Sequence, residues 1–109
     1  VRTMDITTTE SLPGRRITAV KGVAVGSTVR TKNIGKDIGA GLKSLVGGEL
    51  KSYSAMLVEA RSEALSRMEA QATELGADAA VNLRFMTSAV ASGASEILAY
   101  ATAVTTEPV

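Results

Sequence analysis

Cysteine and histidine, the side chains that most often act as nucleophile and general base, are both absent from this sequence. The chain therefore has no thiolate nucleophile, no imidazole base and no disulfide framework. The same absence removes the thiolate and imidazole ligands that soft metal ions require. Any chemistry must come from hydroxyl, amino, guanidinium and carboxylate groups, and we expect a protein that is not an enzyme.

The glycine-rich stretch Gly39–Ser44 invites comparison with a phosphate-binding loop. A Walker motif needs glycine directly before its lysine, so that backbone N–H groups can surround the phosphate. Leu42 occupies that position here, and the stretch lies within a helical pattern. Lys43 and Ser44 are adjacent, and neighbours on a helix point in different directions. We therefore interpret the stretch as a place of close helix packing and predict no catalytic pair there.

Carboxylates and methionines give no clear metal motif either. Hard cations need clustered carboxylates, and no loop pattern gathers the acidic residues Asp5, Asp37, Glu59 and Glu63. Met56 and Met68 lie at helical spacing toward an apolar side, which is typical of residues that fill gaps in a core. Symmetry in an oligomer could collect carboxylates between subunits, although nothing in the sequence specifies such a site. We predict no metal site within one chain and no cofactor.

Arg61 and Asp78 are the two candidate ligand-binding residues. Arg61 falls between Leu57, Leu65 and Met68 in the apolar half of a predicted helix, so its charge must pair or reach solvent. An ion pair with Asp78 or with a neighbouring subunit is one interpretation. The alternative is an anion-binding group in a pocket. Asp78 follows the end of this helix, where an aspartate commonly holds a turn.

Length and composition favour a single small domain, residues 1–109, that associates with copies of itself. Hydrophobic residues make up 45% of the 109, which argues against disorder, but aromatic residues make up only 3%. Alanine, valine and glycine must fill much of the interior, and each buries little area. A monomer built this way would be marginally stable, whereas association adds buried surface.

Charge and hydropathy disfavour several partners. The net charge of +1 creates no strong field for nucleic acid or an anionic membrane, and few aromatic residues are available for base stacking. No segment approaches the roughly 20 apolar residues of a membrane span, and the first ten residues contain no apolar signal core. We expect a cytoplasmic protein that binds neither nucleic acid nor membrane, and Met4 is a candidate natural start.

Four segments have the composition and alternation of strands: Met4–Thr9, Arg16–Thr31, Asp78–Thr87 and Ser95–Thr106. One face of the second segment carries Ile17, Ala19, Val23, Val25 and Val29, and the other carries Thr18, Val20, Gly22, Ala24 and Gly26. Neither face is strongly polar, which is typical of a strand covered on both sides or meeting another subunit. Turn residues at 91–94 predict an antiparallel hairpin of the last two segments.

Two helices are predicted between the second and third strands. The first begins at Asn33 and ends at Gly47–Gly48. The second runs from Ser52 to Leu75 and is capped by Gly76, with an apolar stripe of Tyr53, Leu57, Ala60, Ala64, Met68, Ala72 and Leu75. A Glu63–Arg67 pair is expected on its flank. The order β-β-α-α-β-β predicts an α+β fold, with both helices on one face of a mostly antiparallel sheet.

Several short motifs, in this order and spacing, resemble one known family: Gly22–Gly26, Asn33–Ile34, Val46–Gly48, Tyr53 with Ala60–Arg61, Leu75–Ala79 and Ala101–Val104. Together they resemble the YbjQ-like family of small, uncharacterised bacterial proteins, which carries a heavy-metal-binding label. The match runs from about Ile6 to Val104. The resemblance implies an α+β fold and a ring-like homopentamer whose sheets meet across subunits. It implies no established reaction.

Three functional hypotheses follow. The leading one is a non-enzymatic homo-oligomeric binding or scaffold protein, with a site for a small ligand or ion at the subunit interfaces. The second is a metal-binding protein that uses carboxylate or main-chain oxygens, since cysteine and histidine are absent. The third is an enzyme whose site lies between subunits.

Overall fold

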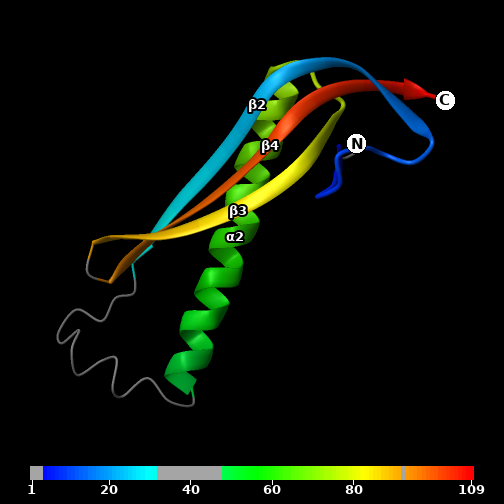
Figure 1. Ribbon diagram of the computed structural model, residues 1–109. Coiled ribbons are helices and arrows are strands. Elements are labelled where there is room, and N and C mark those ends of the chain that lie inside the picture. Colours follow the sequence, from blue (N-terminus) through cyan, green and yellow to red (C-terminus); the bar gives the residue numbers. More distant parts are fainter. Residues whose placement is uncertain (1–3, 32–47, 92) are drawn as a thin grey trace.

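The computed structural model describes residues 4–31, 48–91 and 93–109 of the chain, with side chains omitted at 48–53. It contains strands β1 (Asp5–Ile6), β2 (Arg15–Thr31), β3 (Ala79–Ala91) and β4 (Ala94–Pro108), and helix α2 (Gly48–Glu74). The four strands form one sheet, and α2 packs along one of its faces (Figure 1). The predicted helix from Asn33 lies outside the described residues. The expected α+β class is confirmed, with one described helix.

The strands lie in the order β1-β3-β4-β2. Strand β4 is antiparallel to both β2 and β3, so the predicted hairpin of the last two strands is confirmed. The short strand β1 runs parallel to β3, with Asp5 beside Ala79 and Ile6 beside Ala80. The sheet is therefore mixed, and the first strand is shorter than the predicted Met4–Thr9.

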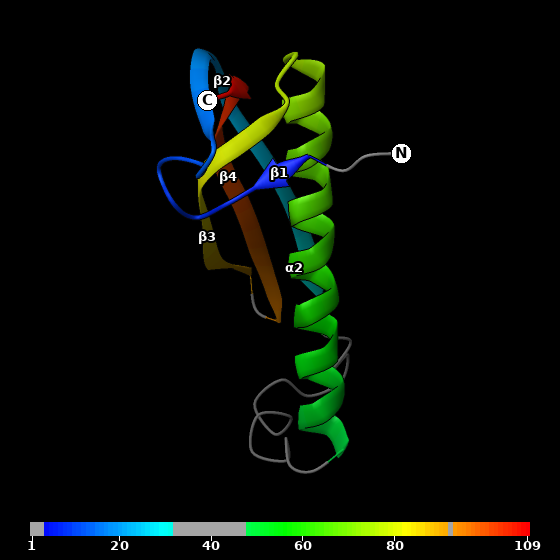
Figure 2. The same cartoon turned by 90° about the vertical axis from the view of Figure 1, so that its right-hand side faces the viewer.

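Helix α2 packs mainly on β2 and β4 through small side chains. The predicted stripe is confirmed where it is described, because Ala60, Ala64, Met68 and Ala72 are fully buried. Opposite them the sheet presents alanines and one glycine, so the two backbones come close together. A Cβ atom built on Gly26 would lie 2.2 Å from the carbonyl oxygen of Ala64. The helix lies on one side of the sheet and extends beyond it at its N-terminal end (Figure 2).

The helix ends in the predicted glycine cap. Gly76 has a φ of 86°, a left-handed conformation that glycine adopts without a steric penalty. The N–H of Ala77 donates to the carbonyl of Ala72 at 3.1 Å, and the N–H of Gly76 donates to Thr73 at 3.0 Å. This pair of bonds is a Schellman motif, which satisfies the last carbonyl groups of the helix.

A second, smaller cluster lies on the opposite face of the sheet. Adjacent residues of a strand point to opposite faces, so Ala79 and Val104 face away from the side on which Ala80 and Ala103 contact the α2 cluster. Leu12 and Ile17 pack against this second cluster. The segment between β1 and β2 therefore covers one end of the face that α2 leaves bare. The rest of that face has no layer over it among the described residues.

Candidate functional site

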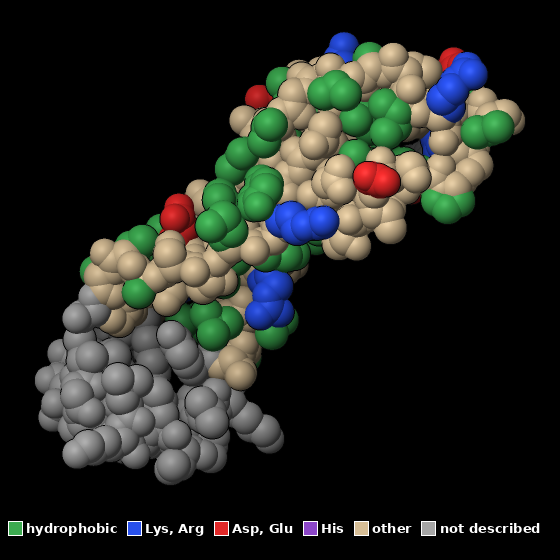
Figure 3. Space-filling model, viewed as in Figure 1, with side chains coloured by type: hydrophobic (Ala, Val, Ile, Leu, Met, Phe, Trp, Pro, Cys, Tyr) green, Lys and Arg blue, Asp and Glu red, His purple; other side chains and the backbone are tan. Residues whose placement is uncertain are grey.

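The uncovered part of the sheet carries a group of exposed apolar side chains, which we call the open face. It is formed by Val23, Val25 and Val29 of β2 and by Met86 and Val90 of β3, with exposed fractions between 41% and 63%. In this region alternate residues of β2, including the buried Ala24, Gly26 and Thr28, face α2 instead. Hydrophobic side chains run along the strands on this side of the molecule (Figure 3).

The open face is poor in charge. Sheet register places Arg84 beside Tyr100, and Glu96 beside Val29 and Ser88, so both charged residues share this face with the valines. The Arg84 guanidinium donates to the carbonyl oxygens of Thr8 at 3.1 Å and Leu83 at 2.8 Å. An apolar surface of this kind suits association with another surface or an apolar ligand, and it offers few groups for chemistry.

The sequence predicted how the side chains of β2 divide between two faces. It did not predict which of these faces α2 covers. The alternation placed Val23, Val25 and Val29 together, and the structure keeps them together on the exposed side. Register shifts between Ile17 and Ala19 and between Val20 and Gly22 interrupt the alternation at the other end of the strand. The sequence did not lead us to place Met86 and Val90 on the open face. They are an even number of residues apart in β3, and this spacing puts both side chains on one face of a strand.

Glu63 joins α2 to β2 through a cluster of polar contacts. Its carboxylate accepts hydrogen bonds from the Thr28 hydroxyl at 3.2 Å and from the Arg30 guanidinium at 3.1 Å. Arg67 lies 2.7 Å from it, which confirms the predicted pair on the helix flank. Hydrogen bonding from Arg30 is the largest cause that holds the pKa of Glu63 below its ordinary value. These contacts join the helix to the strand.

Asp78 is engaged in holding the end of the sheet. Its carboxylate accepts hydrogen bonds from the backbone N–H of Thr106 at 3.0 Å and from the Thr106 hydroxyl at 3.1 Å. Arg15 lies 3.9 Å from the same carboxylate and also donates to the Thr106 hydroxyl at 2.7 Å. These contacts tie Asp78 to β4 and to the start of β2, whereas the predicted role was in a local turn.

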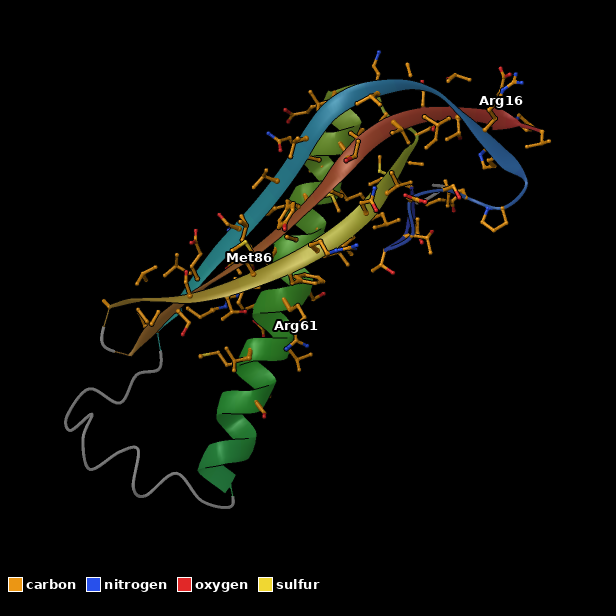
Figure 4. The ribbon with its side chains drawn as sticks, viewed as in Figure 1. Arg16, Arg61 and Met86 are labelled. Carbon is orange, nitrogen blue, oxygen red and sulfur yellow. The ribbon has the colours of Figure 1, made fainter. Side chains whose placement is uncertain are left out.

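Arg61 does not join Asp78. It is exposed on α2, and it forms no ion pair with any residue that the structure describes. It lies near the middle of α2, away from the helix end that leads into β3 (Figure 4). The helix rises about 1.5 Å per residue, so Arg61 and the helix end at Glu74 are about 20 Å apart. The two candidate ligand-binding residues therefore do not form one site within a subunit.

The donor set does not fit a heavy-metal site in the described part of the chain. Soft metals need thiolate or imidazole ligands, and the whole sequence has neither. Within residues 4–31, 48–91 and 93–109, no three acidic side chains come together as a metal site would require. Met68 is buried in the core and Met86 lies exposed on the sheet, so these two thioethers do not converge.

Comparison with known proteins identifies the family. Residues 4–107 match the YbjQ family model, which is described as "Putative heavy-metal-binding". A UPF0145 protein from Methanoculleus marisnigri is 58% identical over 105 residues, which cover 96% of this chain and 98% of that one. Another, from Vibrio campbellii, is 54% identical over 101 residues, covering 93% and 97%. The chain belongs to this uncharacterised family.

The family is wider than the expected bacterial group, because Methanoculleus marisnigri and Archaeoglobus fulgidus are archaea. The UPF0145 protein of Archaeoglobus fulgidus is 58% identical over 99 residues, covering 91% of this chain and 92% of that one.

A solved structure shares the fold. It is a DUF74-family protein of unknown function from Pediococcus pentosaceus, with a TM-score of 0.68, 19% identity and coverage of 95% and 98%. At this identity the likeness concerns the fold alone.

Among the described helical residues, no stretch is long and apolar enough to cross a membrane.

Proposed function

We propose that the chain works as a non-enzymatic homo-oligomeric binding or scaffold protein, and that any ligand site lies where subunits meet. The observation that carries this proposal is the open face, whose valine and methionine side chains have no covering layer in the described subunit. Soluble proteins rarely expose contiguous apolar surface unless something binds there. A second copy of the chain is a partner that is present wherever the protein is made.

The energy available from the open face is modest. Full burial of a valine or methionine side chain contributes roughly 1.5–3 kcal/mol, and these five side chains are about half exposed. Covering them therefore contributes on the order of 5 kcal/mol, whereas association costs about 4–15 kcal/mol in lost freedom of motion. The open face favours association but needs further contacts to hold an assembly.

The number of copies is a separate question. The family resemblance predicts a ring of five subunits, and native mass spectrometry of the untagged protein counts them directly. A reproducible adduct in the same spectrum would give the mass of a bound ligand or ion. A monomer at micromolar concentration would contradict the proposal as a whole.

A matched pair of lysine variants tests whether the open face makes the contact. Val23→Lys places a charge on the open face, and Val58→Lys places the same charge on α2, where the exposed fraction is nearly equal (63% and 57%). We expect the first variant to form smaller assemblies by native mass spectrometry, with an unchanged far-ultraviolet circular dichroism spectrum. The second should assemble as the unmodified protein does. Equal assembly of both variants would show that the open face is not the contact.

A further inference from the structure

Arg61 differs from the other arginines that the structure describes. Each of those others contacts a carboxylate or a carbonyl oxygen: Arg15, Arg16, Arg30, Arg67 and Arg84. Arg61 has no ion pair or hydrogen bond to any group that the structure describes. Residues three and four positions apart meet on a helix surface, and all such neighbours of Arg61 are apolar: Leu57, Val58, Ala64 and Leu65. The helix therefore gives this guanidinium no anionic partner.

Arg61 lies on the side of α2 that is turned toward β3. At 100° per residue, Ala64 points to the sheet, with Glu63 and Arg67 on one side of it and Arg61 and Leu65 on the other. Glu63 and Arg67 contact Thr28 and Ser27 of β2, so their side is the β2 side. The opposite side, with Arg61, is therefore the β3 side.

The neighbouring part of β3 is apolar and only partly covered. Register places Gly26, Ala99 and Phe85 side by side across the sheet, and α2 crosses it at Gly26 with Ala64 and Met68. Residues paired in this way point to the same face. Ala99 is fully buried under the helix, whereas Phe85 is 39% exposed, because α2 packs mainly on β2 and β4.

These residues border one strip between helix and strand, which we call the Arg61 flank: Leu57, Arg61, Leu65 and Phe85. Leu57 and Leu65 are half-buried and pack against the core cluster. The flank thus presents one cation among apolar side chains. Ligand sites in proteins commonly have this composition, with apolar walls and few polar groups that fix the orientation of the ligand.

We propose that the Arg61 flank binds an amphipathic carboxylic acid. The guanidinium would hold the carboxylate by two parallel N–H···O bonds, and the apolar body would lie on Leu57, Leu65 and Phe85. The inference deepens the proposed function and rests on it, because it names the ligand class and the residues that one subunit contributes to a site between subunits. Charge complementarity selects this class: one cation in an apolar strip matches one anionic group on an apolar body, whereas a polyphosphate needs several cationic donors.

Isothermal titration calorimetry with decanoate tests the proposal. Decyltrimethylammonium, which has the same alkyl chain and the opposite charge, is the ligand control. Arg61→Gln removes the cation of the flank, and Arg16→Gln removes an exposed cation far from it as the matched control (Figure 4). We expect saturable binding of decanoate to the unmodified protein and to Arg16→Gln, and binding on the order of tenfold weaker to Arg61→Gln. The ammonium compound should not bind, and Arg61→Glu should reverse the preference between the two probes.

Native mass spectrometry of the same samples separates this inference from the proposed function. An assembly that binds decanoate through Arg61 supports both. If Arg61→Gln binds decanoate as the unmodified protein does, or if the ammonium compound binds equally well, the inference is overturned, because the alkyl chain alone would then account for binding. An intact assembly that takes up no decanoate also overturns the inference and leaves the proposed function standing. If Arg61→Gln loses the assembly instead, the partner of Arg61 is a carboxylate of a second copy, and the ligand inference is wrong. A monomer that binds no decanoate overturns both.

Discussion

Gly26 should be among the residues of β2 least tolerant of substitution, because α2 passes directly over it. A Cβ atom at this position would lie 2.2 Å from both the Ala64 carbonyl oxygen and the Met68 backbone nitrogen, and 2.8 Å from the carbonyl carbon of Arg67. All three are backbone atoms of a helix, so no side chain can rotate away. The Gly26→Ala variant would fold only if helix and strand moved apart by about 1 Å.

A separation of that size weakens the packing on both sides of the contact. A gap of 0.5–1 Å forfeits roughly a quarter to a half of the dispersion energy between facing atoms. The buried stripe of Ala60, Ala64, Met68 and Ala72 faces this gap. We therefore expect Gly26→Ala to lower the free energy of unfolding by about 3 kcal/mol or more, at or above the upper end of the usual overpacking range.

Gly14 provides the control, because its φ is +80° but nothing lies within 4 Å of an added Cβ. Gly14→Ala should cost about 1–2 kcal/mol from backbone strain alone. Both variants are compared with the unmodified protein by urea unfolding at one protein concentration, since association contributes to the measured stability. If Gly26→Ala lowered the free energy of unfolding no more than Gly14→Ala does, the inference that α2 closely approaches β2 at Gly26 would be wrong.

Four further measurements follow from the described contacts. The pKa of Glu63 is lowered by its partners, so the stability it contributes is present above its ordinary pKa and is lost as the pH falls through its lower folded value. Urea unfolding of Glu63→Gln should thus show a deficit at pH 7 that shrinks at pH 3. Arg61→Ala should change the free energy of unfolding by no more than about 0.5 kcal/mol, and a larger loss would reveal a partner in the assembly. Asp78→Ala should lose about 1–3 kcal/mol, because the Thr106 N–H and hydroxyl and Arg15 lose their acceptor. Elemental analysis after dialysis should find no stoichiometric zinc or copper, and a fixed ratio per subunit would contradict the interpretation of the donor set.

Local rules were enough to predict α2 and the hairpin. The stripe through Ala60, Ala64 and Met68 repeats at helical spacing, and Gly76 stops the helix by a mechanism that depends on neighbouring residues alone. The β3–β4 hairpin likewise depends on a short turn. Its strands run further than predicted, because Thr87–Ala91 has no charge or proline to end it.

Long-range features could not be predicted in the same way. The parallel pairing of β1 with β3 joins residues more than 70 positions apart, and only two residues carry it. The clamp of Glu63 on Thr28 and Arg30 depends on where along β2 the helix crosses, which no periodicity specifies. The helical spacing predicted Arg61 in the apolar half of the helix, but its side chain is exposed, because how far the sheet covers the helix depends on long-range packing.

The small residues of the core affect both the packing within one subunit and the apolar surface left exposed on it. Alanines on α2 and glycine on β2 allow the helix to approach the sheet closely, but they bury little apolar area within one subunit. Four larger apolar side chains of the sheet, Val23, Val29, Met86 and Val90, are left on the outside, while Val81, Leu83, Ile97 and Val104 are buried. The apolar side chains that remain exposed on the open face could contribute hydrophobic free energy to a contact beyond the single subunit, and this is the physical argument for the proposed assembly.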